Sequence, residues 1–180
     1  MKICLYGASS STLDETYYTK AQQLGQVLGQ RGHTLVFGGG ATGLMGAAVI
    51  GVEKEGGCSI GIAPRFFDYP GKLYKNCSEF IFTDTMRERK QLMEDMSDGF
   101  IMCPGGIGTF EEFFEILTLK QLGRHNKPIA VFNINNYYDQ LDSMIEKGMR
   151  ENFIEENCCS LYKLFTSPED LLDYLEEQFQ

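Results

Sequence analysis

Two glycine-rich turns contain the residue types that bind an anion. The first is FGGGATGLMG at 37–46, and the second is CPGGIGTFEE at 103–112. Each follows a run of strand-forming residues and leads into a helical pattern. Glycines leave backbone N–H groups accessible, and the N-terminus of a helix favours negative charge. Both turns are therefore candidates for holding a phosphate, and the Thr109 hydroxyl adds a donor to the second.

The first turn also permits a different interpretation. Its Gly38, Gly40 and Gly43 fit the GxGxxG pattern of dinucleotide-binding proteins. That pattern expects an acidic residue about 20 residues further on, at the end of the next strand, to bind a ribose hydroxyl. The next strand here ends at Ile62–Arg65 without an acid, although Arg65 would suit a 2′-phosphate. An NADP-dependent reductase and a purely structural tight turn stay open as weaker alternatives.

Glu112 has two interpretations with equal support from spacing. Thr109 and Glu112 form T-x-x-E, the spacing of a capping box in which the glutamate bonds back to the N-cap amide. Alternatively, Glu112 is the acidic group of an anion-binding pocket, where it would align a ribose hydroxyl or a water molecule.

A basic helical segment follows another predicted strand, at 85–93 (TMRERKQLM). Its Arg89 shares a helical face with Met93 and Met96, at offsets of four and seven residues. An arginine on such an inward face needs an anionic partner, either a carboxylate or a ligand phosphate. Arg87 falls on the polar side, where we expect it to be solvated.

These segments must be positioned by a larger framework. Short β-type runs alternate with helical patterns, which predicts an α/β fold: a Rossmann-like, doubly wound, mainly parallel sheet with helices on both faces. We expect a single nucleotide-binding domain over residues 1–180, with an irregular excursion at 64–78. Ligands bind beyond the carboxyl ends of the strands in such sheets. The predicted strands are 2–6, 34–37, 58–63, 79–83, 100–103 and 128–132, with a weaker one at 161–165.

Composition limits the classes of partner. The 180 residues carry 16 basic and 25 acidic side chains, a net charge of −9, which disfavours nucleic acid polymers and anionic membranes. We expect no signal peptide and no membrane span. The six cysteines form no CxxC pair and only two histidines are present, so no metal site is predicted. Cys4, Cys58 and Cys103 lie in strand-like runs and are expected to be buried and inert, which suits the cytoplasm.

The combination of FGGGATGLMG, MRERKQLM and PGGIGTFEE, in that order, resembles the Lonely Guy (LOG) family over roughly residues 1–150. The members are cytokinin riboside 5′-monophosphate phosphoribohydrolases that have also been labelled lysine decarboxylases. The early YGASS at 6–10 looks like the family's first strand turn. The resemblance implies a Rossmann-like homodimer that hydrolyses the N-glycosidic bond of adenine-type nucleoside 5′-monophosphates, without metal or redox cofactor.

The resemblance also implies roles for individual residues. Arg89 and Glu112 match the family's catalytic arginine and glutamate. Family members usually carry histidine where this chain has Arg87, so the base preferred by the enzyme stays open. The residues expected to bind substrate are Ser9, Gly39, Gly40, Met86, Lys90, Gly105, Gly106, Gly108 and Thr109.

Two alternatives to this hydrolase remain from the sequence. A nucleotide-binding or carrier protein of the same fold would bind AMP without releasing adenine, and the NADP-dependent reductase is less favoured. Pyridoxal chemistry, which a lysine decarboxylase would need, requires a Schiff-base lysine and a partner for the ring nitrogen. No segment here offers a convincing pair.

Overall fold

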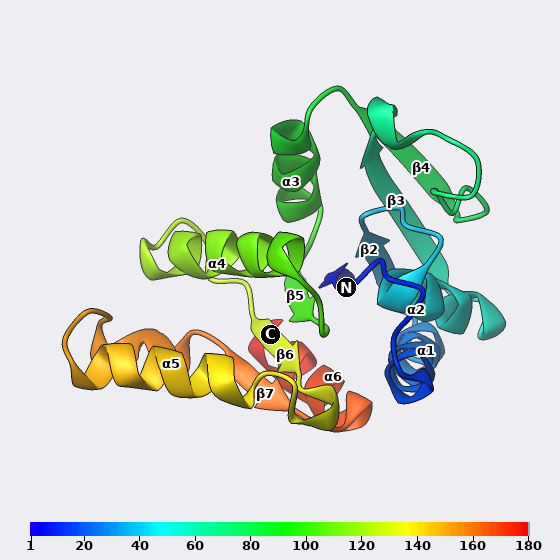
Figure 1. Ribbon diagram of the computed structural model, residues 1–180. Helices are drawn as coiled ribbons and strands as arrows, with labels where there is room; N and C mark the ends of the chain where they lie inside the picture. The colour runs from blue at the N-terminus through cyan, green and yellow to red at the C-terminus, as the bar shows by residue number, and fades with distance from the viewer. Residues whose placement is uncertain (180) are drawn as a thin grey trace.

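Seven short strands, rich in branched and aromatic residues, form one sheet in the order β4-β3-β2-β1-β5-β6-β7 (Figure 1). The computed structural model describes residues 1–179. Every neighbouring pair of strands is parallel. The strands are β1 (Lys2–Tyr6), β2 (Thr34–Phe37), β3 (Cys58–Pro64), β4 (Glu79–Thr83), β5 (Gly99–Met102), β6 (Ile129–Phe132) and β7 (Lys163–Phe165).

Six α-helices form a layer on each face of the sheet; five of them connect strands, and α6 follows the last strand. They are α1 (Glu15–Gln30), α2 (Gly43–Lys54), α3 (Met86–Asp95), α4 (Ile107–Gln121), α5 (Asp139–Arg150) and α6 (Pro168–Phe179). Core residues of α1, α2 and α6 belong to one buried cluster, and those of α3, α4 and α5 to a second. This arrangement confirms the predicted α/β fold with helices on both faces.

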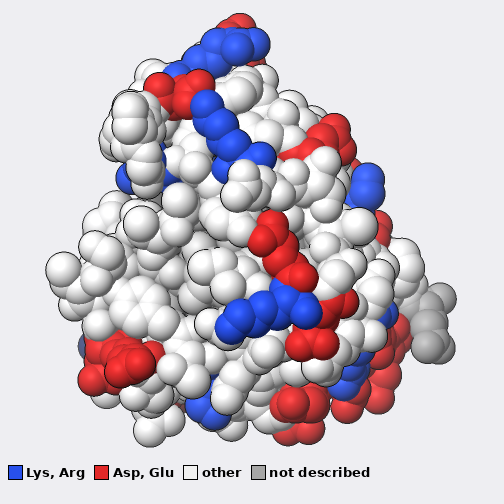
Figure 2. All heavy atoms as spheres, turned by 90° about the vertical axis from the view of Figure 1, so that its right-hand side faces the viewer, with Lys and Arg blue, Asp and Glu red and all other residues white. Residues whose placement is uncertain are grey.

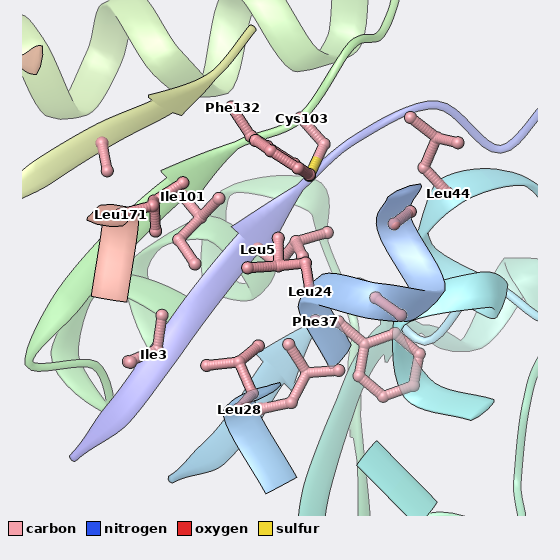
Figure 3. Close-up of a cluster of buried hydrophobic side chains, with 14 of the residues drawn as sticks. Ile3, Leu5, Leu24, Leu28, Phe37, Leu44, Ile101, Cys103, Phe132 and Leu171 are labelled. Carbon is pink, nitrogen blue, oxygen red and sulfur yellow. The ribbon is translucent and has the colours of Figure 1, made fainter. Parts of the chain in front are cut away.

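The central strand β1 contributes to both cores because it is covered on both faces. Its Ile3 and Leu5 belong to the first cluster, and Figure 3 shows Leu5 beside Leu24 of α1, with Ile3 further along the strand. Cys4 and Tyr6, on the alternate positions, belong to the second cluster. A strand buried on both faces appears in the sequence as a continuous apolar run, which is why its bounds were predictable.

Most predicted elements are confirmed, with small shifts at the ends. The fifth strand begins at Gly99 and ends at Met102, one residue earlier than expected at each end. The helix α5 was not predicted, although Leu141, Ile145 and Met149 recur at four-residue spacing and pack in the second cluster. The excursion at 64–78 contains one 3-10 turn, Arg65–Phe67.

The expectation for the cysteines is correct at two positions and wrong at the third. Cys4 and Cys103 are buried, and burial raises the pKa of the Cys4 thiol to about 12. Cys58 is exposed, because it is the first residue of β3, where the strand has only begun to enter the sheet.

The order of the strands defines where a ligand can enter. The chain runs outward from β1 to β4 on one side, then returns through α3 to β5 on the other side of β1. The loops after β1 and β5 therefore diverge, which opens a crevice at the carboxyl ends of these strands. In Figure 1, α3 and α4 lie on one side of the sheet, and α1 and α2 lie on the other.

Charge on the surface is mixed rather than of one sign. On the face shown in Figure 2, acidic and basic groups are interspersed with broad uncharged areas. Within residues 1–179, no helix combines the length and apolarity needed to cross a bilayer.

Candidate active site

A cavity of about 300 Å³ occupies the crevice at the carboxyl ends of the central strands. Its walls come from the loops after β1 and β2, the loop between β3 and β4, and the N-terminal turns of α3 and α4. The charged side chains that line it are Lys72, Arg89 and Glu112. Two cations and one anion face the cavity in a chain whose net charge is −9. The site is thus a local exception to the acidity of the whole molecule.

Arg89 is held from two directions at the base of this cavity. It is 6% exposed, its Nε donates to the Ile62 carbonyl at 3.2 Å, and its Nη1 donates to Glu112 Oε1 at 2.8 Å. A guanidinium in two such hydrogen bonds has little freedom to rotate. The prediction that Arg89 lies on the inward face of its helix and has an anionic partner is confirmed.

Gly38 provides the space for that guanidinium. A Cβ built on Gly38 would lie 2.0 Å from Arg89 Nη2 and 3.1 Å from Arg89 Cζ. Because Gly38 has no side chain, the Arg89 guanidinium can occupy the space beside the first glycine turn.

Glu112 does not belong to a capping box. The N-cap of α4 is Gly106, so Thr109 is already the third helical residue and no side chain caps this end. Glu112 therefore lies in the second turn, 9% exposed, with its carboxylate on Arg89. The capping interpretation is wrong because α4 begins two residues before Thr109. The same T-x-x-E spacing at Thr85–Glu88 does form a capping box, at the start of α3.

Burial controls the protonation of Glu112. Removal from water raises the pKa of the Glu112 carboxyl above its ordinary 4.5, and the charge of Arg89 opposes that rise without cancelling it. The group is an ion-paired carboxylate with an increased affinity for a proton. Such perturbed carboxyls in a cleft are typical of catalytic sites.

The two glycine turns differ in the donors they leave free. At the first, the Ala41 N–H donates to Lys72 O at 3.0 Å and the Leu44 N–H donates to Ala8 O at 2.8 Å. Gly43 adopts φ +69°, and a Cβ there would lie 2.1 Å from Ala8 O. These two N–H groups of the first turn therefore join the loops after β1 and β2 to the segment that covers the site.

The second turn offers its N–H groups to the cavity. The first residues of an α-helix have no acceptor within the helix, and the N-cap Gly106 has no side chain to supply one. Gly106, Gly108 and Thr109 line the cavity. The N-terminus of α4 is therefore a candidate anion-binding position, because its free N–H donors and the positive end of its helix dipole lie at the cavity.

The irregular segment 65–78, here named the covering loop, lies against the first glycine turn. It is attached by the Ala41–Lys72 hydrogen bond, by the Tyr74 N–H donating to Gly39 O at 2.8 Å, and by the Tyr74 hydroxyl on Glu53. These bonds direct Phe67 and Lys72 into the cavity wall. The Lys72 ammonium lies 5.6 Å from the centroid of the Phe67 ring.

Lys72 is the charged cavity residue that the sequence did not indicate. It lies in a segment without periodicity, and no motif precedes it. Phe67 and Leu73 were missed as lining residues for the same reason, whereas Met45 was missed although it lies in the first glycine motif. Within residues 1–179, Lys72 forms no ion pair, so its charge is available to a ligand.

The predicted substrate-binding residues separate into two groups. Six line the cavity: Ser9, Gly40, Met86, Gly106, Gly108 and Thr109. Gly39 and Gly105 do not, although Gly105 lines a neighbouring cavity. Lys90 points elsewhere, because its ammonium pairs with Glu111 and, at 2.9 Å, with Glu115 on the outer face of α4.

The residues weighed for other roles lie away from the cavity. Arg87 is exposed, as expected. The side chain of Arg65, which an NADP site would use, is 70% exposed, and its Nε lies 3.5 Å from Asp84 Oδ1 in a surface ion pair. In residues 1–179, no three His, Cys, Asp or Glu side chains gather as metal ligands would.

The fold and this cavity together define a Rossmann-like protein with a candidate anion-binding site in the crevice at the carboxyl ends of β1 and β5. Residues 45–175 match the model of a family described as "possible lysine decarboxylase". The chain is 37% identical over 176 residues to the cytokinin riboside 5′-monophosphate phosphoribohydrolase LOG2 of Arabidopsis thaliana, covering 98% of this chain and 83% of the relative. It is 36% identical over 176 residues to the probable cytokinin riboside 5′-monophosphate phosphoribohydrolase LOGL5 of Oryza sativa subsp. japonica. That alignment covers 98% of this chain and 72% of the relative. The chain belongs to this LOG family.

Solved structures of low identity share the fold. The molybdenum cofactor binding protein of Rippkaea orientalis superposes with a TM-score of 0.75 at 22% identity, over 99% of this chain and 97% of that one. The molybdenum cofactor carrier protein of Chlamydomonas reinhardtii superposes with a TM-score of 0.74 at 19% identity, over 98% of this chain and 96% of that one. At these identities the likeness concerns the arrangement of strands and helices.

Proposed function

We propose that this chain hydrolyses the N-glycosidic bond of adenine-type nucleoside 5′-monophosphates and releases the free base and ribose 5-phosphate. The observation that carries the proposal is the buried Arg89–Glu112 pair, which faces a cavity beside the uncapped N-terminus of α4. Membership of the LOG family supports it, since the curated relatives are named as phosphoribohydrolases of this substrate type.

The first requirement of the reaction is to hold the phosphate. The N–H groups at the start of α4 and the Thr109 hydroxyl supply donors, and Lys72 supplies a positive charge from the covering loop. With the phosphate at that position, the ribose lies over Glu112. The base then extends toward Met45, Phe67 and Met86, which offer apolar contacts.

Breakage of the bond between C1′ and the base nitrogen makes the ribose cationic. The electron pair of that bond leaves with the base, and an oxocarbenium-like transition state develops on the sugar. The Glu112 carboxylate stabilises this charge and accepts a hydrogen bond from a ribose hydroxyl. Water then adds to C1′, its proton is lost, and the base gains a proton. Arg89 is a positioning residue for Glu112, because it fixes the carboxylate and keeps it ionised.

The assembly and cellular place of the chain belong to the same proposal. The proposal is a single domain that acts in the cytoplasm as a homodimer, and the apolar side chains on and beside α4 support the homodimer. Ile107, Phe114 and Leu122 are 82%, 40% and 66% exposed there. Exposed apolar groups of this kind favour burial against another chain. Light scattering during size-exclusion chromatography measures the mass directly.

The test compares Glu112→Gln with wild type on AMP, with release of adenine followed by chromatography. Glutamine keeps the shape of the side chain and an oxygen for Arg89 but removes the negative charge. We expect adenine release to fall by at least about 100-fold, the scale of removing one electrostatic stabiliser of a transition state. Adenosine serves as a second substrate, because it lacks the phosphate and should be cleaved far more slowly.

Glu111→Gln is the matched control. It removes a carboxylate from the same helix, and its partner Lys90 lies on α3 as Arg89 does, but the pair is outside the cavity. Its activity should equal that of wild type. Circular dichroism of all three proteins excludes a loss of folding as the cause. Wild-type adenine release by a folded Glu112→Gln variant would refute the role of Glu112, and tight AMP binding by wild type without any release would indicate a carrier.

A further inference from the structure

A second cavity of about 300 Å³ lies next to the first and has no role in the proposed reaction. It is lined by residues from the β1–α1 connection, the loop after β5 and the segment after β6: Ala8, Ser10, Leu13, Tyr17, Pro104, Gly105, Gly106 and Tyr137. Its side chains differ in kind from those of the first cavity, since none of them is charged. Two aromatic rings and a leucine are among its lining side chains.

The two cavities meet at the anion-binding turn. Ala8 and Gly106 line both of them. Gly106 is the N-cap of α4, so a phosphate bound by the first turn of this helix would lie on the boundary between the cavities. One of its ester oxygens leads to the ribose over Glu112. Another can lead into the second cavity.

The aromatic wall of the second cavity is fixed in place. The Tyr137 hydroxyl donates to the Gly105 carbonyl at 2.7 Å, and the Tyr17 and Tyr137 rings pack edge to face with centroids 6.3 Å apart. Tyr137 nevertheless remains 41% exposed. A rigid and partly exposed aromatic wall is suited to stacking with a planar ring, because little conformational entropy is lost on binding.

The topology favours a ligand that spans both cavities. In doubly wound sheets, dinucleotides bind across the switch point with their phosphates at a helix N-terminus between the two halves. Here the first cavity lies on the β2 side of β1, and the second is bounded by the segments after β5 and β6. The two cavities therefore occupy the two halves of such a site, and α4 begins between them.

We infer that the second cavity is a subsite for an aromatic base joined through a diphosphate to the nucleotide in the first cavity. The chain thus accepts ligands of the dinucleotide class as well as nucleoside monophosphates. This inference rests on the proposed function for the position of the phosphate.

The experiment compares AMP, ADP and P1,P2-diadenosine 5′-diphosphate as ligands. ADP extends the phosphate without adding a second nucleoside, so the comparison isolates the contribution of the second adenosine, and the Tyr17 variants below assign its base. Dissociation constants are measured by calorimetry on Glu112→Gln protein, in which turnover does not interfere. We expect the diadenosine compound to bind about tenfold more tightly than ADP, the scale of one base stacking on an aromatic side chain.

Variants of Tyr17 assign that gain to the second cavity. Tyr17→Ala removes the ring and should bring the diadenosine compound to the affinity of ADP, while Tyr17→Phe keeps the ring and should retain the gain. AMP hydrolysis should be unchanged in both, tested in the wild-type background. Ser10→Trp fills the cavity from its exposed edge and gives the same loss without removing a packed ring.

The outcomes separate this inference from the proposed function. Equal affinity for ADP and the diadenosine compound in the parent protein overturns the subsite, whatever the hydrolytic activity. A large loss of AMP binding in Tyr17→Ala also overturns it, because the ring would then serve the nucleotide itself. Absence of adenine release from AMP by wild type overturns the proposed function and leaves the binding comparison readable.

Discussion

Gly38→Ala should disable the site through one added carbon atom. The new Cβ would lie 2.0 Å from Arg89 Nη2, whereas real Cβ atoms essentially never approach another heavy atom closer than 3.0 Å. The clash cannot be relieved without cost, because hydrogen bonds from Arg89 Nε to Ile62 O and from its Nη1 to Glu112 hold the guanidinium where it is. The guanidinium must move by about 1 Å or the first glycine turn must shift.

A small displacement of the Arg89 guanidinium should cause a large loss of activity. A misplacement of about 1 Å in a positioned group can cost about 100-fold in rate, so we expect kcat/KM for AMP to fall by that factor. The hydrogen bond to Glu112 would be lost or stretched, at a cost of about 2 kcal/mol in the free energy of unfolding. The loss of activity should therefore exceed what unfolding explains at room temperature.

The assay measures adenine release and thermal unfolding of the same samples. Gly148→Ala is the matched control, since its Cβ would lie 2.7 Å from the end of the Ile154 side chain, on α5 and outside the cavity. It should keep the wild-type rate. A folded Gly38→Ala protein with wild-type activity would refute the argument that Gly38 makes room for Arg89. An equal loss in Gly148→Ala would show that the effect is not specific to the site.

Three further outcomes follow from the same geometry. Because burial raises the pKa of Glu112, kcat should decline on the acid side, with a midpoint above pH 4.5, as the carboxylate gains a proton. The parameter to follow is kcat, since the substrate phosphate also titrates near pH 6 and affects binding. Lys72→Met should raise KM for AMP about tenfold with little change in kcat, through loss of a charged phosphate contact; an unchanged KM would remove Lys72 from the phosphate site. Thr85→Ala breaks the capping box with Glu88 and should lower stability by about 1 kcal/mol, or Tm by about 2–4 °C, in calorimetry; an unchanged Tm would mean that this cap contributes nothing.

The framework and the catalytic candidates could be predicted from residue types and their spacing. Strands such as β1 and β6 were predictable because both faces are buried, which leaves an apolar run with recognisable ends. Arg89 was recognisable from its helical face, because a charge among methionines requires a partner. The order of the three motifs indicated the family.

The position and partner of Glu112 follow from long-range folding. T-x-x-E spacing is equally compatible with a cap and with a site, and the choice depends on where α4 begins. It begins at Ile107, and the return of the chain from β4 to β5 places α3 beside α4, so that Arg89 meets Glu112 across 23 positions of sequence. No local pattern encodes that contact.

The same reason explains the residues on which the sequence was silent or misleading. Lys90 lies in a recognisable motif, but its ammonium pairs with acids on the outer face of α4. Lys72 lies in no motif, yet it forms part of the cavity wall. The position of Lys72 is set by backbone hydrogen bonds between the covering loop and the first glycine turn. Such bonds involve groups that every residue carries, so side-chain types along the chain cannot reveal them. The sequence determined which chemistry is available, and long-range backbone pairing decided which side chains deliver it.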